Sequence, residues 1–396
     1  MDPAVTTAGA EGTSPRTQPR AGRASRCERS QLGLRGVLIV GGGVTRTSFL
    51  RPAGTFLLRP GPFSAIWGAT GLLFLVSWAT TPQSVSHGSL LGMLPFAAVL
   101  AIAAVGQTLV IQQGGIDLSV PGTISITVIV LTRIPNGDSG KLGMAILIAY
   151  AISLGAGAVN GLMVTRVGIT PIVATLGMNA LLYGGVLEIS HGTPRDTTQA
   201  LYSFANNTPL GIPTTVWLAA GVTTVVGFVV KRTVVGRRFE AVGANAAAAR
   251  ASGLGVARYT LGAYLAASVL YCSAGVLLAG IVKTPSAFQG DSYLLPSVAA
   301  VVLGGTSLLG GVGSVVASAM GALFLSQLEQ LVLTTGVNTA IQYLIEAAAI
   351  AAGVAVYNLR WSQVREWITS RTSSGTHGGR LPSGEERGSL ESRAEA

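Results

Sequence analysis

Long apolar runs, separated by short polar segments, fill this chain from Pro62 to Leu359. Each run approaches the roughly 20 residues that a helix needs to cross the hydrocarbon core of a bilayer. A backbone in lipid must satisfy its own hydrogen bonds, and apolar runs of this kind do so as helices. The sequence therefore predicts an all-α integral membrane protein with about ten transmembrane helices, some of them broken. The expected spans are Phe63–Thr80, Leu90–Gln112, Ile116–Leu131, Gly143–Thr165, Ile172–Ile189, Thr214–Val230, Tyr259–Val282, Leu294–Leu309, Val312–Thr335 and Ala340–Leu359.

The composition supports this class. Hydrophobic residues make up 49% of the chain and charged residues 11%, against about a quarter charged in soluble domains. The net charge is +10, but much of it lies in the N-terminal tail and between spans. The lipid bilayer with its anionic headgroups is therefore the expected partner, and nucleic acid is not. Cys27 and Cys272 are the two cysteines, and we expect neither a disulfide nor a metal site from them.

The ends of the chain differ from its middle. We expect a disordered basic N-terminal tail over 1–61, a transmembrane domain over 62–359 and a disordered C-terminal tail over 360–396. The N-terminal tail does not have the pattern of a signal peptide. Gly36–Val44 superficially resembles a dinucleotide-binding loop, but Arg46 stands where the third glycine of that loop belongs, so nucleotide binding is not expected.

Basic residues predict the orientation. The segment Lys231–Arg258 lies between two spans, and by the positive-inside rule a short basic loop stays in the cytoplasm. An even number of spans puts the other basic segments on the same side, so both termini are expected to be cytoplasmic. Those segments are the N-terminal tail, Arg166, Arg360 and Arg365. Ser190–Pro213 and Thr284–Tyr293 should then lie outside.

The Lys231–Arg258 segment also predicts a short helix. Phe239–Ala251 is rich in alanine, Glu240 near its start suits the positive helix N-terminus, and Gly253 and Gly255 end it. Two interpretations stay open at this point: a solvated connector with positive-inside charge, or a cytoplasmic docking helix.

A lone acid marks the second apolar stretch. Gly106–Gly122 reads GQTLVIQQGGIDLSVPG, and its glycines and Pro121 predict a broken helix whose freed backbone groups face protein or water. Asp117 and Ser119 are expected to cap the next helix. An intramembrane acid equally suggests a translocation path.

Other polar residues lie within apolar runs. Thr175, Asn179 and Tyr183 are spaced i, i+4 and i+8 and share one helix face. Singly they favour interhelical hydrogen bonds, and as a stripe they favour lining a path. Asn160 precedes this stripe as a further candidate. Gln342 and Glu346, also spaced by four, lie in the last span, where Glu346 must face protein or water.

No enzyme motif is present. Val301–Ser314 reads VVLGGTSLLGGVGS and predicts a tight glycine-rich hairpin, but no Gly-Lys-Ser/Thr follows to make a phosphate loop. No HExxH, GxSxG or paired-carboxylate arrangement appears, and the three histidines are scattered. We expect a protein that is not an enzyme, with no cofactor of its own, and any ATP hydrolysis on a separate chain.

Four motifs together resemble one family. GGIDLSVPG, NGLMVTRVGITPIVATLG, GRRFEAVGANAAAARASGLGV and VVLGGTSLLGGVGS are similar, in this order, to segments of ABC importer permeases of the ribose and simple-sugar type. The resemblance covers about Leu90–Tyr357. The departures are Pro121 for glycine, Ile172 for phenylalanine, and Glu346–Ala347 where a basic residue and glycine are common. The third motif is the family's cytoplasmic coupling loop, and the residues assigned to it here are Gly236, Arg237, Arg238, Glu240, Ala241, Gly243, Asn245, Ala248, Ala249 and Gly253.

The resemblance implies a function. It implies the permease subunit of a bacterial ABC importer in the plasma membrane, moving a ribose-like monosaccharide by alternating access. The coupling loop would fit a cleft on a separate ATPase subunit, which would bind the ATP. If the loop docks in this way, Gly243 and Ala249 would allow close approach to the cleft, and Glu240 would meet a basic group there. A second permease copy or paired permease and an extracytoplasmic sugar-binding protein would complete the system. The alternatives are a branched-chain amino-acid permease, an ion-coupled secondary transporter and a membrane enzyme.

Overall fold

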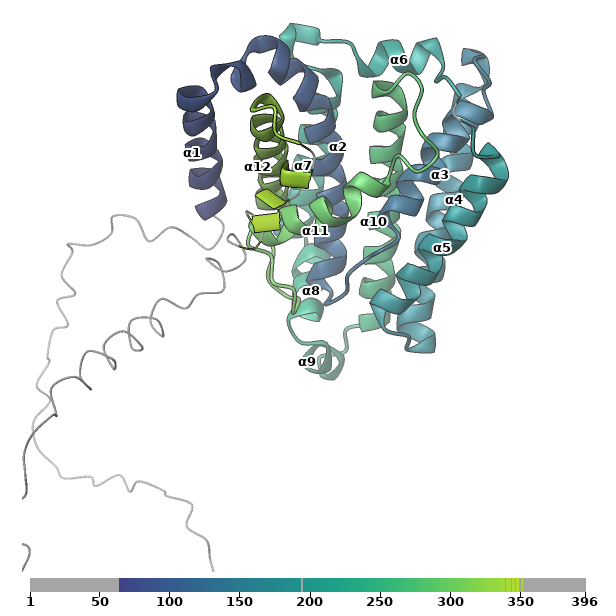
Figure 1. Ribbon diagram of the computed structural model, residues 1–396. Coiled ribbons are helices and arrows are strands. Elements are labelled where there is room, and N and C mark those ends of the chain that lie inside the picture. Colours follow the sequence, from purple (N-terminus) through teal and green to yellow (C-terminus); the bar gives the residue numbers. More distant parts are fainter. Residues whose placement is uncertain are drawn as a thin grey trace, which may run out of the picture. The chain divides into compact units, whose positions relative to one another are not determined.

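The structure is a computed structural model that describes residues 64–193, 195–338, 340–342, 344–345, 347–348 and 351. Helices and turns, without strands, make up the described residues (Figure 1). The two terminal tails expected to be disordered lie outside them. The helices are α1 (Ala65–Thr80), η1 (Pro82–Val85), α2 (His87–Gln112), α3 (Val120–Arg133), η2 (Ser139–Lys141), α4 (Leu142–Leu162), η3 (Met163–Val167), α5 (Pro171–Ser190), α6 (Gln199–Ala205), η4 (Pro209–Gly211), α7 (Thr214–Arg232), α8 (Val234–Ala244), α9 (Ala246–Ala251), α10 (Val256–Ile281), η5 (Asp291–Tyr293), α11 (Leu294–Leu303) and α12 (Val315–Thr334).

Six helices of the described part are long and apolar enough to cross a membrane, and they confirm the helical membrane class. They are α2, α4 with its flanking turns, α5, α7, α10 and α12. Three expected spans form shorter apolar helices: α1, α3, and η5 with α11. The tenth expected span, Ala340–Leu359, lies largely outside the described residues. The total of ten therefore stays a prediction.

The centre of the bundle is the pair α2 and α10. From Ala97 to Gln112 every residue of α2 is buried, and α10 packs against α2, α3 and α4. The two helices approach closely at Gly106, where a Cβ atom would lie 2.7 Å from the ring of Tyr271. Small residues allow such approaches between membrane helices. The core is therefore built on helix pairs that glycine and alanine bring together.

Each central helix is followed by a non-helical segment and a short helix. α3 has 14 residues and α11 has 10, so α3 is about 21 Å long at 1.5 Å per residue, less than the roughly 30 Å hydrocarbon thickness. In Figure 1 the chain leaves α2 at the end occupied by α8 and turns back towards the middle before α3 begins. The second segment bonds to the first short helix, since Gly290 N donates to Ser125 Oγ at 3.0 Å. The prediction of broken helices is confirmed.

Two expected spans have wrong boundaries, and the reasons are local. Ile116–Leu131 was expected as one span, but α3 begins at Val120, because Asp117 Oδ1 accepts hydrogen bonds from Ser119 N and Oγ in a non-helical turn. The second span with a wrong boundary is Leu294–Leu309, because α11 already ends at Leu303. Gly305 follows with φ +82°, a conformation that glycine adopts without strain.

The helix expected over Phe239–Ala251 is two helices. α8 begins five residues earlier, at Val234, where Thr233 Oγ1 caps it by accepting from Gly236 N at 3.1 Å. The break lies at Asn245, whose Oδ1 accepts from Ala247 N at 3.0 Å and Ala248 N at 2.9 Å and caps α9. The alanine run favours one helix, but an asparagine side chain that caps competes with continuation.

Candidate functional site

The segment α8–α9 lies at one end of the bundle, between α7 and α10 (Figure 1). It is fixed to the end of α2. Gln113 Nε2 donates to Phe239 O at 2.9 Å, and a Cβ atom on Gly243 would lie 2.0 Å from Gln112 O. Only a residue without a side chain fits at that approach. α8 therefore contacts the point where α2 gives way to the broken segment.

The burial pattern divides the predicted residues of this loop into two faces. Gly236, Phe239, Val242 and Ala249 are buried. The exposed residues of the segment, which we call the outer face, are Val234, Val235, Arg237, Arg238, Ala241, Ala244, Asn245, Ala247, Ala248, Arg250 and Ala251, and Gly253 just beyond α9 is exposed as well. Small side chains and three arginines thus make up most of the outer face.

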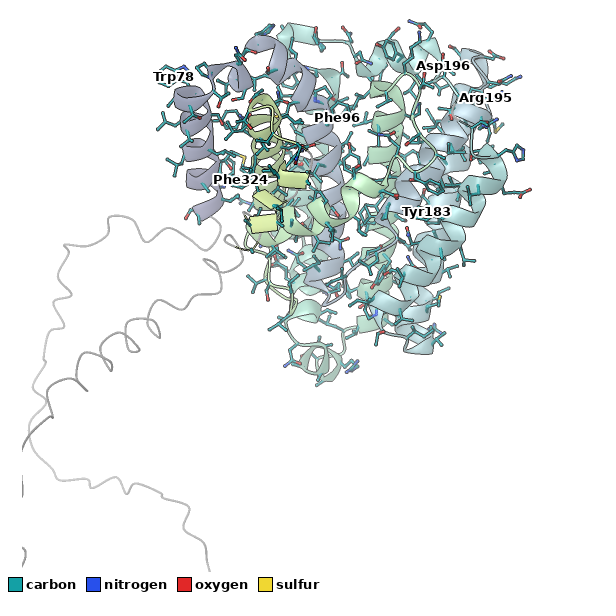
Figure 2. The ribbon with its side chains drawn as sticks, in the orientation of Figure 1. Trp78, Phe96, Tyr183, Arg195, Asp196 and Phe324 are labelled. Atoms are coloured by element: carbon teal, nitrogen blue, oxygen red, sulfur yellow. The ribbon has the colours of Figure 1, made fainter. Side chains whose placement is uncertain are left out.

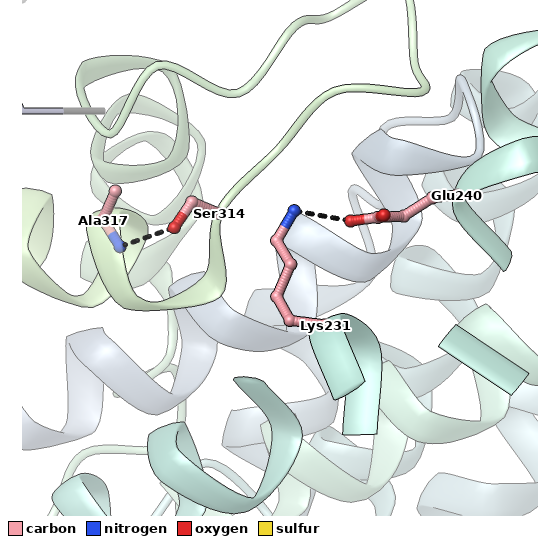
Figure 3. Close-up of polar contacts among 4 residues, drawn as sticks. All are labelled: Lys231, Glu240, Ser314 and Ala317. Atoms are coloured by element: carbon pink, nitrogen blue, oxygen red, sulfur yellow. Dashed lines mark hydrogen bonds and ion pairs between the residues drawn. The ribbon is translucent and has the colours of Figure 1, made fainter. Parts of the chain in front are cut away.

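Three details of the expected docking helix are corrected. Gly243 and Ala249 were expected to allow close approach of a partner, but Gly243 packs against α2 and Ala249 is 5% exposed. Glu240 was expected to meet a basic group on a partner, whereas its Oε1 lies 2.6 Å from Lys231 Nζ within the chain (Figure 3). Exposed ion pairs of this kind contribute about 0–1 kcal/mol. A partner would therefore meet the alanines and arginines of the outer face.

The glycine-rich segment between α11 and α12 is a hairpin, as predicted. Ser307 N donates to Val312 O at 2.9 Å, and Gly311 N donates to Gln112 O, also at 2.9 Å. Ser314 then caps α12 by accepting from Ala317 N at 3.3 Å (Figure 3). The hairpin and α8 therefore converge on the same carbonyl group at the end of α2.

Asp117, Ser119 and Asn160 are brought together inside the bundle. Asp117 is 1% exposed, and its Oδ1 accepts from Ser119 N at 2.8 Å and Ser119 Oγ at 2.6 Å. Asn160 Nδ2 of α4 donates to Ser119 Oγ at 2.9 Å. Of the two capping residues expected, Asp117 forms the turn before α3, while the Ser119 side chain makes no capping bond.

The stripe on α5 bonds the broken segment and the first turn of α3. Thr175 Oγ1 accepts from Leu118 N at 2.9 Å, and Asn179 Oδ1 accepts from Gly122 N at 2.8 Å. These side chains face the bundle, as the sequence suggested. Tyr183, labelled in Figure 2, donates to Asp291 Oδ1 and packs edge-on against Phe288 with ring centroids 5.1 Å apart. A part for the stripe in a path stays a prediction.

Polar residues that the sequence analysis did not single out join this cluster. Tyr271 of α10 and Gln107 of α2, both fully buried, are hydrogen-bonded at 2.7 Å. The sequence feature that could have identified them is a polar side chain within an apolar span. Gln342 is 7% exposed, and Glu346 lies outside the described residues, so their expected common face is not described.

Long apolar helices, two of them followed by broken segments that polar side chains hold inside the bundle, define a polytopic membrane protein of the transporter kind. The chain belongs to the family described as "Branched-chain amino acid transport system / permease component", which it matches over residues 89–354. It is thus a multi-pass protein of the bacterial inner membrane and a permease subunit of the ABC importer type. Subunits of this family are not themselves enzymes.

Its relatives include permeases for different small molecules. The chain is 35% identical to the ribose import permease protein RbsC of Escherichia coli K12 over 296 residues, which cover 72% of this chain and 91% of that protein. It is 34% identical to the fructose import permease protein FruF of Bifidobacterium longum, over 66% of this chain and 75% of that protein. It is also 34% identical to the autoinducer 2 import system permease protein LsrC of an Enterobacter strain, over 65% and 75%. No solved structure matches the chain.

Proposed function

We propose that this permease translocates a simple sugar of the ribose type, with ATP hydrolysis on a separate cytoplasmic subunit. The names of the relatives support this substrate class, because the chain is 34–35% identical to a ribose permease and a fructose permease. The family description names branched-chain amino acids, but the names of the relatives reported above give ribose, fructose and autoinducer 2. An amino-acid permease is therefore the less favoured alternative.

The outer face of α8–α9 is proposed to dock on the ATPase subunit. Its alanines offer a close-fitting surface, and Arg237 and Arg250, which lie outside the lining of the neighbouring groove, would meet acidic groups on the partner. The inner side supports a transmission role. α8 contacts Gln112 and Gln113 through Gly243 and Phe239, and the hairpin bonds the same Gln112. A displacement of α8 would therefore reach the broken segment after α2 and the glycine-rich hairpin before α12 through one joint.

The translocation path is proposed to follow these broken segments. The candidates are the residues that the sequence analysis singled out: Asp117, Ser119, Asn160, Thr175, Asn179, Tyr183, Gln342 and Glu346. The buried hydrogen bonds among Asp117, Ser119 and Asn160 fit a closed state, and alternating access would exchange some of those bonds for sugar hydroxyls or water. We propose further that a second permease copy and an extracytoplasmic sugar-binding protein complete the importer, with both termini and α8–α9 in the cytoplasm.

The test is reconstitution of the permease in proteoliposomes with its ATPase and its binding protein. Pentoses, hexoses and branched-chain amino acids are offered in turn, and we expect a sugar alone to stimulate ATP hydrolysis and uptake. Ala247→Trp places a large side chain on the outer face. Stimulated hydrolysis should then fall about tenfold or more, since a misfit of about 1.4 kcal/mol already weakens an interface tenfold.

The matched control is Ala151→Trp, because Ala151 is an exposed alanine on α4, away from the outer face. It should leave stimulated hydrolysis at the wild-type rate. Normal stimulation in Ala247→Trp would contradict docking through α8–α9. Uptake of leucine or valine without sugar uptake would instead support the amino-acid alternative.

A further inference from the structure

An apolar groove of about 750 Å³ lies between α7, α8 and α10. α7 and α10 both pack on α2, and Leu109 of α2 lines the groove with Val225 and Val229 of α7 and Ala266 and Val269 of α10. The volume is within the roughly 300–1,000 Å³ of small-molecule sites. Lining residues on α10 extend from Arg258 to Leu270, which corresponds to about 18 Å of helix at 1.5 Å per residue. The groove is thus long and narrow.

The charge of the groove is confined to one end. Arg238 of α8 and Arg258 at the start of α10 belong to the lining. They are its charged residues, and no acidic residue is among the lining that the structure describes. Neither guanidinium takes part in an ion pair or hydrogen bond with another described residue. Both are exposed at the end of the bundle where α8–α9 lies.

The rest of the groove opens sideways onto the bilayer. Val225 is 62% exposed and Val229 42% exposed, and Ala266 and Gly262 are exposed as well. These positions belong to transmembrane helices, so their exposed surface faces lipid or another membrane helix. An occupant must therefore combine an extended apolar part at membrane depth with an anionic group at the membrane surface.

We propose that the groove binds an anionic phospholipid, with an acyl chain along α7 and α10 and the phosphate against Arg238 and Arg258. Arginine forms paired hydrogen bonds with phosphate oxygens, and basic pockets between membrane helices bind anionic headgroups. A neutral helix from a second copy would fill the apolar part but leave two guanidinium groups unmatched. Lipid binding does not depend on the proposed transport function. The lipid would lie in the cytoplasmic leaflet, and this one assignment rests on the proposed orientation.

The test measures lipid retention by the full-length permease alone. The detergent-purified chain is incubated with equal amounts of phosphatidylglycerol and phosphatidylcholine that carry the same acyl chains, and native mass spectrometry counts the bound lipids. The wild type should retain phosphatidylglycerol in preference by about tenfold or more, because two arginines attract its anionic headgroup. Arg238→Gln with Arg258→Gln should bring that ratio close to one.

The matched control is Arg237→Gln with Arg250→Gln, which removes the same charge from the same segment but outside the groove lining. It should keep the preference. Equal retention of both lipids by the wild type, or an equal loss of preference in this control, would overturn the proposal.

A second pair of variants tests the apolar half. A Cβ atom on Gly262 would meet no atom within 4 Å, so Gly262→Phe extends into the groove without disturbing the helix contacts. It should lower phosphatidylglycerol retention severalfold. Gly221→Phe, at an equally open and exposed position of α7 outside the lining, should not. Unchanged retention in Gly262→Phe would place the lipid elsewhere, and disulfide-linked dimers of Val229→Cys in native membranes would assign the groove to a second copy.

Discussion

At the scale of single residues, two side chains of α5 accept hydrogen bonds from backbone N–H groups at the start of α3. The first N–H groups of a helix have no partners within it. Asn179 accepts from Gly122 N in the first turn of α3, and Thr175 accepts from Leu118 N just before it. Inside a membrane protein, water does not replace a lost hydrogen-bond acceptor. Removing the acceptor therefore costs the full free energy of leaving a buried N–H donor unpaired.

Thr175→Val removes the acceptor without changing the shape of the side chain, and Thr175→Ser retains it. We expect the valine variant to be destabilised by about 1–3 kcal/mol, the cost of an unpaired buried donor. The serine variant should lose less, about 0.8 kcal/mol for one buried methyl group. Thermal unfolding in detergent measures both. If valine proved as stable as the wild type, the hydrogen bond to Leu118 would not hold the broken segment in place.

At the scale of elements, the joint between α8 and α2 is a close backbone contact of the α8–α9 segment with the centre of the bundle. The Gly243 Cα faces Gln112 O, and the hairpin donates to the same oxygen through Gly311 N. Backbone lies against backbone here, so no rotamer change can make room for a side chain. A single methyl group must displace α8 or the end of α2, and this makes the joint a sensitive place to separate the segment from the bundle.

Gly243→Ala should therefore loosen α8–α9. The readout is maleimide labelling of purified protein in a background where Cys27 and Cys272 are replaced by alanine. Ala249→Cys lies at a position that is 5% exposed, so it should label slowly with Gly243 present and at least severalfold faster with Gly243→Ala. The exposed Ala247→Cys should label at the same rate in both. Slow labelling of Ala249→Cys in both backgrounds would show that the joint tolerates a side chain.

At the scale of the whole molecule, α8–α9 and α6 lie at opposite ends of the described bundle (Figure 1). Arg195 and Asp196 belong to the α6 end (Figure 2), where Asp196 accepts from Thr284 Oγ1 at 2.6 Å. Six basic residues and one acid, Glu240, lie between Lys231 and Arg258 at the α8–α9 end. By the positive-inside rule we expect that end to lie in the cytoplasm.

Cysteine labelling in intact cells tests this orientation in the same cysteine-free background. A membrane-impermeant maleimide should label Asp196→Cys and leave Ala247→Cys unlabelled, because only the α6 end would face outward. Permeabilised cells should label both, which controls for accessibility. Labelling of Ala247→Cys alone in intact cells would reverse the orientation and remove the basis for an ATPase on the α8–α9 side.

The sequence by itself determined the class of the protein and most of the long helices. α2, α7 and α10 begin and end within three residues of the expected spans, because apolar residues in lipid leave the helix as the one economical way to satisfy the backbone. The glycine-rich motifs predicted the broken helices and the hairpin, and the four motifs together indicated the permease family.

The tertiary structure alone decided which side of each element faces a partner. In the sequence Gly243 and Ala247 are equivalent small residues of one loop, yet the first is fixed against Gln112 and the second is exposed. Thr175 and Asn179 could equally have faced water, and their bonds to Leu118 and Gly122 depend on how α5 packs on α3. Periodicity places residues on a common face of a helix, but contacts between distant segments decide what that face meets. The groove lined by Arg238 and Arg258 likewise exists only because α7 and α10 both pack on α2.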